Sequence, residues 1–531
     1  MLVHTRSVAD KVFEVWRSPG RFTKNPDIVA LPSGRLLIVY SDTDSHWSQE
    51  NQVLTLLASD DQGRTWFKYR EVAEHDLRRG DERLVTPRLS RLSDGRLVVL
   101  VDQDDYGHFH EDQPPGNLAF WSADDGATWS DVQDTGIAGF EPDRMIELPD
   151  GALAVGSHQM RCRDGRHGYA EILTCSEDDG KTWQERGQVA YDGDHYFCEG
   201  GIILLDGGKE LACVMRDNQN AGYPGWVAFS KDLGRTWSEP QMAPFHLHRP
   251  YGKQLADGRV LVTGRNVLGG LGTYAWVGDL RSELDYQVGG PRMGFSADLT
   301  DEALVVHNRP ETEFRYILLP PESVRSEVRM EAVLKVDGPA GTPVAFLAVS
   351  RIGVAVTIAP DAVGIGKGVD RRRPVDMTRY RRVTLAYARG LCRVLIDGET
   401  LLNTTVHPVN APLGGMHRGG PLEGYTHFGQ AGAVGESHWQ SVSYESRNRT
   451  HPDVRWSWQA VDGRWPDEYQ RRRMIQIHAN EPTPDRGPDH GYSSWVVLDD
   501  GRILLVDYTN AGAERGKSHL VGVYIEPEDI A

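Results

Sequence analysis

The chain has 531 residues and a formal net charge of −18. So acidic a protein has no electrostatic attraction for nucleic acid or anionic membranes, and no run of 18 apolar residues is present to span a bilayer. Five irregularly spaced cysteines predict neither a disulfide framework nor a zinc ribbon, and we expect no metal or cofactor. The start of the chain lacks the apolar stretch of a signal peptide, so the expected location is cytoplasmic.

The first segment, residues 2–16, is expected to supply a strand that closes a ring with the end of the chain. After it, a phrase recurs in which two apolar runs flank an Asp-Gly or Ser-Gly pair, a strong signal of a β-hairpin. Its turn glycines are Gly34, Gly95, Gly151, Gly207, Gly258 and Gly501. The first five lie 51 to 61 residues apart, which indicates a repeat of small β units.

A second phrase, Ser-x-Asp-x-Gly-x-Thr-Trp, follows each of the first four hairpins. Its copies begin at Ser59, Ser122, Ser176 and Ser230. The Asp can hydrogen bond to its own turn, the Gly allows a positive φ, and the Trp can pack between strands. We therefore interpret these boxes as structural and expect them on the outer edge of each unit.

Four-stranded antiparallel units repeated around an axis form a β-propeller. The predicted fold class is all-β: a six-bladed β-propeller with an inserted β-sandwich of the jelly-roll type. An array of β-sandwiches is the competing architecture, but a repeat of about 55 residues is too short for a sandwich domain of roughly 100.

The insert is predicted from the long step of 243 residues between Gly258 and Gly501. We divide the chain into blades one to five (1–297), an inserted sandwich (298–445), and a linker with the closing blade six (446–531). The phrase YRRVTLAYARGLCRVLIDGETL resembles the concanavalin-like jelly-roll of carbohydrate-binding and lectin-like modules. That resemblance implies either a spacer or a sugar-binding module.

The mouth of the propeller is predicted from strand direction. The first strand of each blade lines the channel, and its start shares a rim with the end of the antiparallel strand that follows. Cationic and aromatic candidates for substrate binding at this rim are Lys24, Arg88, Arg144, His158, Arg216, Arg249, Tyr251 and Arg265. Asp42, Asp44, Glu199 and Tyr492 are the candidates for chemistry. Such a collection in one funnel is typical of a site for a polyhydroxylated or anionic ligand.

Two segments resemble the sialidase (neuraminidase) superfamily. CEGGIILLDGGKELACVMR is similar to the segment that begins with the family's Glu and ends with an Arg, here Glu199 and Arg216. GYSSWVVLDDGRILLVDY is similar to the final segment that carries its catalytic Tyr, here Tyr492. The resemblance implies a tyrosine nucleophile and a glutamate base, an exception to the usual pair of carboxylates. A phenol, with its pKa near 10, needs such a base.

Three departures from the family pattern predict a substrate other than sialic acid. The family holds the sialic acid carboxylate with three arginines, because a guanidinium matches a carboxylate in bidentate fashion. Here the first phrase reads Lys24-Asn25-Pro26, and the segment GGLGTYAW, where the third is due, has no arginine. The loop of the acid/base aspartate reads SDTDSHWSQE, which offers Asp42 and Asp44.

Histidine is unusually frequent in the predicted rim segments: His46, His108, His110, His158, His195, His246, His248 and His490. A histidine can serve as acid, base or metal ligand near neutral pH. His195 and His490 are the most interesting, because they lie close in sequence to Glu199 and Tyr492. A His–Tyr pair with an arginine to neutralise a carboxylate is what β-elimination from a uronate needs.

Three functions remain open from the sequence. The first is a sialidase-like exo-acting glycoside hydrolase that removes a terminal, non-sialic, acidic or deoxy sugar from an oligosaccharide. It would use Tyr492 as nucleophile, Glu199 as its base and Asp44 or Asp42 as acid/base. The second is a lyase of uronic-acid glycosidic bonds that uses Tyr492 with His195 or His490, and the third is a non-catalytic glycan-binding propeller.

Overall fold

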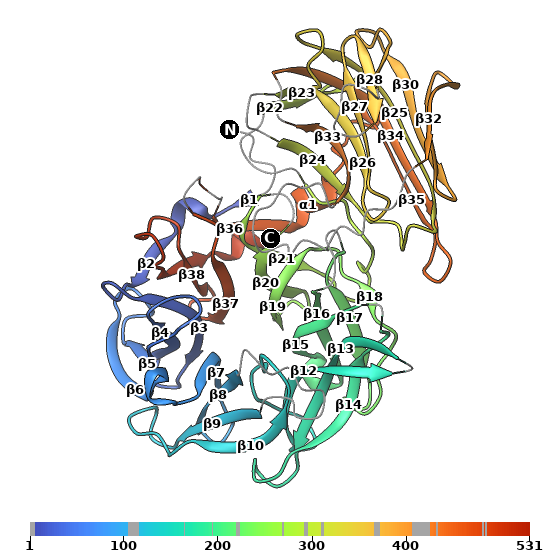
Figure 1. Ribbon diagram of the computed structural model, residues 1–531. Coiled ribbons are helices and arrows are strands. Elements are labelled where there is room, and N and C mark those ends of the chain that lie inside the picture. The colour runs from blue at the N-terminus through green and yellow to red at the C-terminus, as the bar shows by residue number, and fades with distance from the viewer. Residues whose placement is uncertain are drawn as a thin grey trace.

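The computed structural model describes residues 6–104, 116–163, 165–193, 195–218, 223–267, 270–290, 296–308, 313–365, 372–405, 425–431, 434–480, 483 and 486–531. Almost all regular structure in these residues is β-strand. Figure 1 shows six sheets arranged around a central axis, with a separate pair of sheets on one side of the ring. The predicted fold class, a six-bladed propeller with an inserted β-sandwich, is confirmed.

The first four blades are antiparallel sheets built from consecutive strands. Blade one has β3 (Phe22–Ala30), β4 (Leu36–Thr43), β5 (Asn51–Ser59) and β6 (Phe67–Asp76). Blade two has β7 (Arg83–Arg91), β8 (Leu97–Asp104), β9 (Gly116–Ser122) and β10 (Gln133–Ala138). Blade three has β11 (Ile146–Glu147), β12 (Leu153–Arg163), β13 (Arg166–Ser176) and β14 (Gln184–Ala190). Blade four has β15 (Phe197–Leu205), β16 (Glu210–Asp217), β17 (Trp226–Ser230) and β18 (Gln241–Met242).

The last two blades combine distant parts of the chain. Blade five has β19 (Leu247–Gln254), β20 (Val260–Asn266), β21 (Gly272–Gly278) and β36 (Met474–Ala479), with β1 (Arg6–Ser7) parallel to β36 at its edge. Blade six has β37 (His490–Val497), β38 (Ile503–Thr509), β39 (His519–Ile525) and β2 (Phe13–Trp16). Because β2 pairs with β39, the two ends of the chain close the ring, as predicted.

The sequence-based boundaries of the insert need correction. It was placed between blades five and six, but β36 pairs with β21, so the insert interrupts blade five before its outer strand. The stretch interpreted as a linker contains β35 (Val454–Gln459), which pairs with β34 (Gly435–Arg447) of the insert. The hairpin phrase marks only the first two strands of a blade, so it could not locate an outer strand displaced by almost 200 residues.

The insert consists of two antiparallel sheets around one core. Its larger sheet has β22 (Ser296–Leu299), β23 (Leu304–Asn308), β34, β25 (Glu327–Asp337), β30 (Arg381–Ala388), β31 (Leu391–Ile396) and β32 (Glu399–Thr405), with β35 beside β34. The other has β24 (Glu313–Leu318), β33 (Thr426–Ala431), β26 (Ala345–Val349), β27 (Val354–Ala359), β28 (Ala362–Ile365) and β29 (Arg372–Pro374). Met330 of the first and Leu347 of the second belong to one buried cluster, which makes the insert a sandwich. Its concanavalin-like character stays a prediction.

The boxes seal the seams between blades. In the first, Asp61 accepts hydrogen bonds from Ser59 and Thr65, and the Trp66 indole donates to the Gly63 carbonyl at 2.9 Å. Gly63 has φ +88°, and a Cβ there would lie 2.4 Å from Leu504 of blade six. The box therefore needs a glycine both for its turn and for close approach to the preceding blade.

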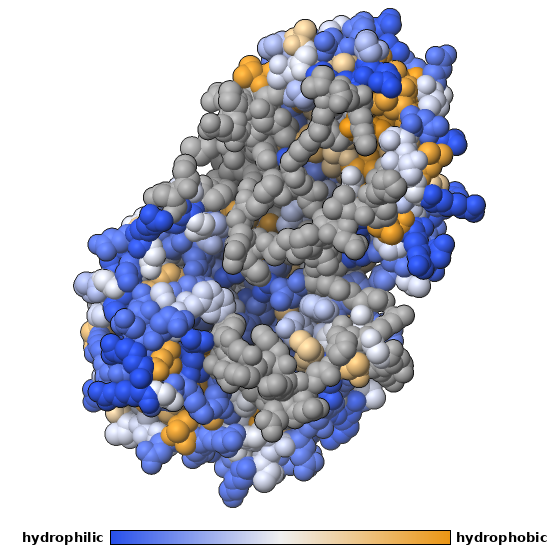
Figure 2. Space-filling view, in the orientation of Figure 1, coloured by the Kyte–Doolittle hydropathy of each residue, from blue (hydrophilic) through white to orange (hydrophobic). Residues whose placement is uncertain are grey.

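The sandwich packs against blade four. The ring of His451, which follows β34, lies 5.4 Å from that of His195, and the Arg351 guanidinium lies over the Tyr223 ring at 5.4 Å. Figure 2 shows that the visible faces of both parts are largely hydrophilic. Among the helices of the described residues, including α1 (Glu468–Arg473), none has the length and apolar character of a membrane span.

Candidate active site

One backbone feature recurs near the start of the inner strand of every blade. A non-glycine residue there has φ between +45° and +63°: Asn25, Thr86, Glu141, Glu199, Arg249 and Tyr492. In five of the six blades the ladder register shifts at this point, which marks a β-bulge. A positive φ costs a residue of this kind on the order of 1–3 kcal/mol, and such strain clusters at functional sites. In Figure 1 the inner strands β3, β7, β15, β19 and β37 lie around the central axis.

Four of these six residues form one contact group. The Tyr492 hydroxyl donates to Oε1 of Glu141 at 2.7 Å and lies 3.5 Å from Oε1 of Glu199. The Arg249 backbone N–H donates to Oε2 of Glu199 at 3.0 Å, and its guanidinium lies over the Tyr492 ring at 5.3 Å. The structure thus gathers a phenol, two carboxyl groups and an arginine from blades three to six.

The pKa values of the two carboxyl groups are shifted in opposite directions. Burial and the neighbouring charge of Glu199 raise the pKa of Glu141 to about 7. Burial of Glu199 acts in the same direction, but the attraction of Arg216 outweighs it and the pKa of Glu199 is lowered far below its usual value. Two carboxyl groups that share a site are expected to separate in this way. Burial raises the pKa of Tyr492 well above its ordinary value, and the charges of Glu141 and Glu199 add to the shift.

The arginines of the mouth are held by protein acceptors. Arg216 forms an ion pair of 2.5 Å with Glu199 and donates to Asn218. The Arg249 guanidinium donates to the carbonyls of Glu141 and Pro142 at 3.0 and 2.9 Å.

Arg265 is held in the same way. Its Nε donates to the His490 carbonyl at 2.5 Å, and the guanidinium lies over the Tyr492 ring at 5.7 Å. The three guanidiniums therefore orient the site's own groups.

Arg144 forms the floor of the mouth. It pairs with the buried Asp27 of blade one, donates to the Tyr251 hydroxyl of blade five at 2.5 Å, and donates to the Ser494 hydroxyl of blade six at 3.2 Å. One side chain of blade three therefore reaches three blades across the axis. Arg88 is also buried, and burial lowers its pKa to about 10, with the charge of Arg249 adding to the effect. Arg144 thus crosses the axis of the ring at the level of Ser494, two residues after Tyr492 on the same inner strand.

The predicted acid/base candidates of blade one lie within that blade. Asp42 pairs with Arg21 at 2.6 Å and accepts from the Ser18 hydroxyl at 2.5 Å. Asp44 accepts from the hydroxyls of Ser45 and Ser48 and from two backbone N–H groups of its own loop. The Lys24 ammonium donates to the carbonyl of His46 at 2.5 Å. No contact in the described residues joins either aspartate to the Tyr492 hydroxyl.

The histidines have separate environments. His158 accepts from the backbone N–H of Glu199 at 3.3 Å, and burial lowers its pKa to about 3. His195 is buried, contacts Asp192 at 2.6 Å and packs on the Trp226 ring. His490 is buried, and burial lowers its pKa well below its ordinary value. His108 and His110 lie outside the described residues. In the part of the chain that is described, no group of three or more His, Cys, Asp and Glu residues could hold a metal ion.

Sequence reasoning missed Glu141. In blade three the sequence pointed to Arg144, although the residue with positive φ is Glu141. The residue with positive φ precedes the hairpin glycine by eight to ten positions in every blade, and Glu141 precedes Gly151 by ten. Alignment of the six hairpin glycines could have found it. The signal in the sequence is weak, because the distance from this residue to the hairpin glycine varies from blade to blade while the hydrophobic pattern stays the same.

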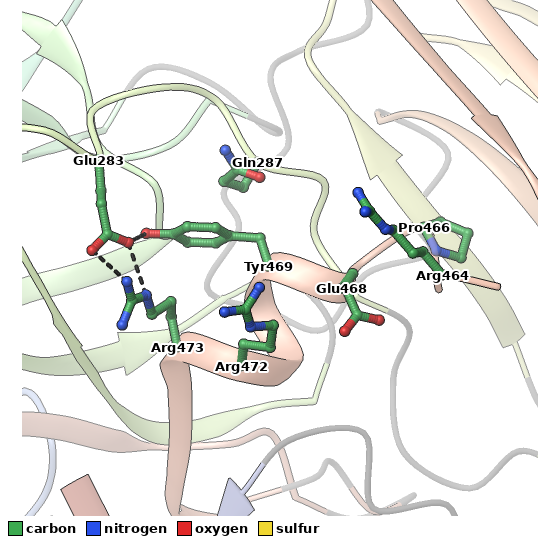
Figure 3. A pocket seen from close by; sticks show the side chains of 8 residues that line it. All are labelled: Glu283, Gln287, Arg464, Pro466, Glu468, Tyr469, Arg472 and Arg473. Carbon is green, nitrogen blue, oxygen red and sulfur yellow. Dashed lines mark hydrogen bonds and ion pairs between the residues drawn. The ribbon is translucent and has the colours of Figure 1, made fainter. Parts of the chain in front are cut away.

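A separate cavity of about 320 Å³ lies beside α1, where the chain returns from the sandwich to blade five. Figure 3 shows Tyr469 and Arg473 directed toward Glu283. The Tyr469 hydroxyl donates to Glu283 at 2.9 Å, and Arg473 pairs with it at 2.7 Å. None of the mouth residues lines this cavity, so the candidate site rests on the convergence around Tyr492.

Residues 72–264 match the BNR repeat-like domain. No curated protein matches the chain significantly. Similar solved structures include a Dyadobacter fermentans protein of unknown function, at 17% identity over 60% of this chain and 95% of that one, with a TM-score of 0.43. Trypanosoma rangeli sialidase with sialic acid has 13% identity, 84% and 97% coverage and a TM-score of 0.38. Penicillium chrysogenum alpha-L-arabinanase with arabinobiose has 16% identity, 56% and 92% coverage and a TM-score of 0.40.

At these TM-scores the three likenesses support no conclusion about this chain. The family match of residues 72–264 supports the repeat, and the order of strands in the sheets supports the propeller fold. The predicted resemblance to propellers of the sialidase type is confirmed for the repeat and for the fold.

Proposed function

We propose that this BNR-repeat propeller is an exo-acting glycoside hydrolase that removes a terminal sugar other than sialic acid from an oligosaccharide. The observation that carries the proposal is the Tyr492 hydroxyl, held 2.7 Å from Glu141 and 3.5 Å from Glu199, with Arg144 spanning the axis of the ring as a floor. A phenol between carboxyl groups is a nucleophile with a base at hand. Such a floor favours attack at a chain end.

The two carboxyl groups both adjoin the phenol. The Tyr492 hydroxyl lies 2.7 Å from Glu141 and 3.5 Å from Glu199, whereas an ordinary glycosidase pair flanks the sugar itself. The nucleophile in our proposal is therefore Tyr492, and its oxygen bonds to the anomeric carbon as the bond to the leaving sugar breaks.

Glu141 is the proposed base, in place of the Glu199 predicted from the resemblance. Its pKa of about 7 suits proton transfer near neutral pH, while Arg216 keeps Glu199 ionised. Glu141 takes the proton of Tyr492 as the phenol oxygen attacks, and it returns this proton to the phenol when water displaces the tyrosine. The oxygen of the leaving sugar lies on the opposite face of the anomeric carbon and takes its proton from solvent, and the attacking water later gives a proton back to solvent. Two displacements at one carbon give net retention.

The substrate is proposed to be uncharged at its terminal sugar. A sialic acid site needs arginine forks directed at the ligand carboxylate. Here the guanidiniums of Arg216 and Arg249 donate to protein oxygens, and Arg144 is committed to the floor. An anionic sugar would have to displace these contacts, whereas a neutral sugar would not.

The lyase alternative has no supporting observation. It requires His195 or His490 as partner of Tyr492, but His195 contacts Asp192 and the imidazole of His490 is buried. Glycan binding without catalysis is a possible outcome of the test below.

The test is incubation of the full chain with a panel of neutral and anionic glycosides and oligosaccharides, with products read by mass, anomeric NMR and absorbance near about 235 nm. We expect uptake of one water, net retention, and loss of turnover in Tyr492→Phe. The matched control is Tyr508→Phe, since the Tyr508 hydroxyl donates to Asp489 at 2.7 Å on the same blade. Absorbance without water uptake would establish a lyase. Binding without turnover would establish a lectin.

A further inference from the structure

Blade three projects beyond the rim. Its second strand, β12, has 11 residues, as has β13, while the second strands of the other five blades have seven or eight described residues. The hairpin glycine lies at the start of β12, on the floor side, so the additional residues extend on the side of the mouth. They form an overhang beside Glu141 and Glu199.

A row of rings lines this overhang and continues onto blade four. Phe140 and His158 have ring centroids 5.7 Å apart, His158 and Tyr169 5.2 Å, and Tyr169 and Tyr196 5.1 Å. Phe140 directly precedes Glu141, and His158 accepts from the backbone of Glu199. The row therefore starts at the two carboxyl groups and leads away from them.

Most rings of the row are partly exposed and do not belong to the core. Phe140, Tyr169 and Tyr196 are half-buried, and only His158 is fully buried. Within the described residues, neither the Tyr169 nor the Tyr196 hydroxyl has a hydrogen-bond partner, and neither is among the buried unpartnered atoms. Both hydroxyls are therefore available to solvent or to a ligand.

We propose that Phe140, Tyr169 and Tyr196 form a subsite for the sugar that follows the scissile bond. This proposal rests on the proposed function. The floor confines the terminal sugar to the depth of Tyr492, so the next sugar must lie toward the opening, where the overhang begins. Aromatic rings accept the apolar C–H face of a sugar, and the two phenols can hydrogen bond to its hydroxyls. The substrate class is therefore a chain of at least two sugars with a neutral second unit.

The test compares two substrates of the sugar released in the glycoside panel: its disaccharide, and its glycosyl fluoride, which has a leaving group too small to reach the row. We expect Tyr169→Ala and Tyr196→Ala to lower kcat/KM for the disaccharide about tenfold, mainly through KM, and to leave the fluoride within about twofold. Tyr169→Phe keeps the ring and should lose less. Phe67→Ala is the control, since Phe67 is 43% exposed and packs edge-to-face against Tyr69 on β6, the outer strand of blade one.

Equal losses on both substrates, or no loss on either, would overturn the subsite. The subsite would also be overturned if saturation-transfer NMR detected no binding of any glycan of the panel to the Tyr492→Phe variant. If Tyr492→Phe retains full turnover while the alanine variants lose only the disaccharide, the nucleophile assignment fails and the subsite stands. Melting temperatures close to that of the parent chain would show that the variants are folded.

Discussion

Blades three and four each place a glutamate with positive φ near the start of the inner strand, yet the two carboxyl groups differ in acidity. Glu199 pairs with Arg216 of its own blade, and its pKa is lowered. Among the described residues the Glu141 carboxyl forms no ion pair; it accepts from Tyr492, and its burial and the charge of Glu199 raise its pKa. The backbone fixes where each group lies, and one arginine decides which of them can exchange a proton near neutral pH.

The other blades extend the comparison. Blades one and two carry Asn25 and Thr86 at the bulge, both without charge, while blades five and six carry Arg249 and Tyr492. The reactive groups therefore occupy one arc of the mouth. The opposite arc offers amide and hydroxyl groups that can bind sugar hydroxyls.

The largest effect is expected for Tyr492→Phe. Loss of the phenol oxygen removes the nucleophile, so kcat should fall by about 10³-fold or more, with ligand binding preserved. Tyr508→Phe should stay within about tenfold of the parent. Steady-state kinetics with the released glycoside check this prediction, and similar losses in the two variants would contradict it.

Next in size is Arg216→Ala. It leaves the Glu199 carboxylate buried without its partner, which should destabilise the fold by about 3–5 kcal/mol. It should also bring the pKa of Glu199 closer to that of Glu141. Arg329→Ala removes an exposed pair with Glu331 and should cost under about 1 kcal/mol. Urea unfolding measures both variants. Equal unfolding midpoints for Arg216→Ala and Arg329→Ala would show that the buried ion pair does not stabilise the fold more than the exposed one.

A smaller loss, of about 10²-fold in kcat, is expected for Glu141→Gln. In the parent chain, activity should fall as the pH drops below about 7, because Glu141 must be ionised to accept a proton. The variant should lack this acid limb. The decisive measurement is the pH–rate profile. If the Glu141→Gln variant keeps the same acid limb as the parent chain, a group other than Glu141 causes that limb.

The same group should affect stability with a definite sign. The folded pKa of Glu141 lies above the unfolded value near 4.3, so the folded chain binds more protons between these values. Its contribution to stability is present below the unfolded pKa and is lost as the pH rises through about 7. The melting temperature of Glu141→Gln relative to the parent should therefore increase between pH 5 and pH 8.

The smallest effect is expected far from the mouth. Asp61→Ala breaks the hydrogen bonds of the first box and should cost about 1 kcal/mol while leaving kcat/KM unchanged. Thermal unfolding and kinetics on one preparation check this. A loss of activity without a loss of stability would contradict the structural role of the boxes.

The sequence by itself determined the repeat, and with it the fold. Six hairpin glycines and four boxes are local signals, because each turn needs its own residues. They predicted six blades, the closing strand and two partners of the site, Glu199 and Tyr492. These two lie in phrases long enough to carry a resemblance.

Only the tertiary structure decided which groups act together. Tyr492 and Glu141 are 351 positions apart, and no local pattern states that the phenol donates to Glu141 rather than to Glu199. Arg144 looked like a ligand for substrate, but ring closure turns it toward Asp27 as a floor. The place of β36 was hidden for the same reason: contacts between distant strands depend on how the ring closes, which a single sequence does not record.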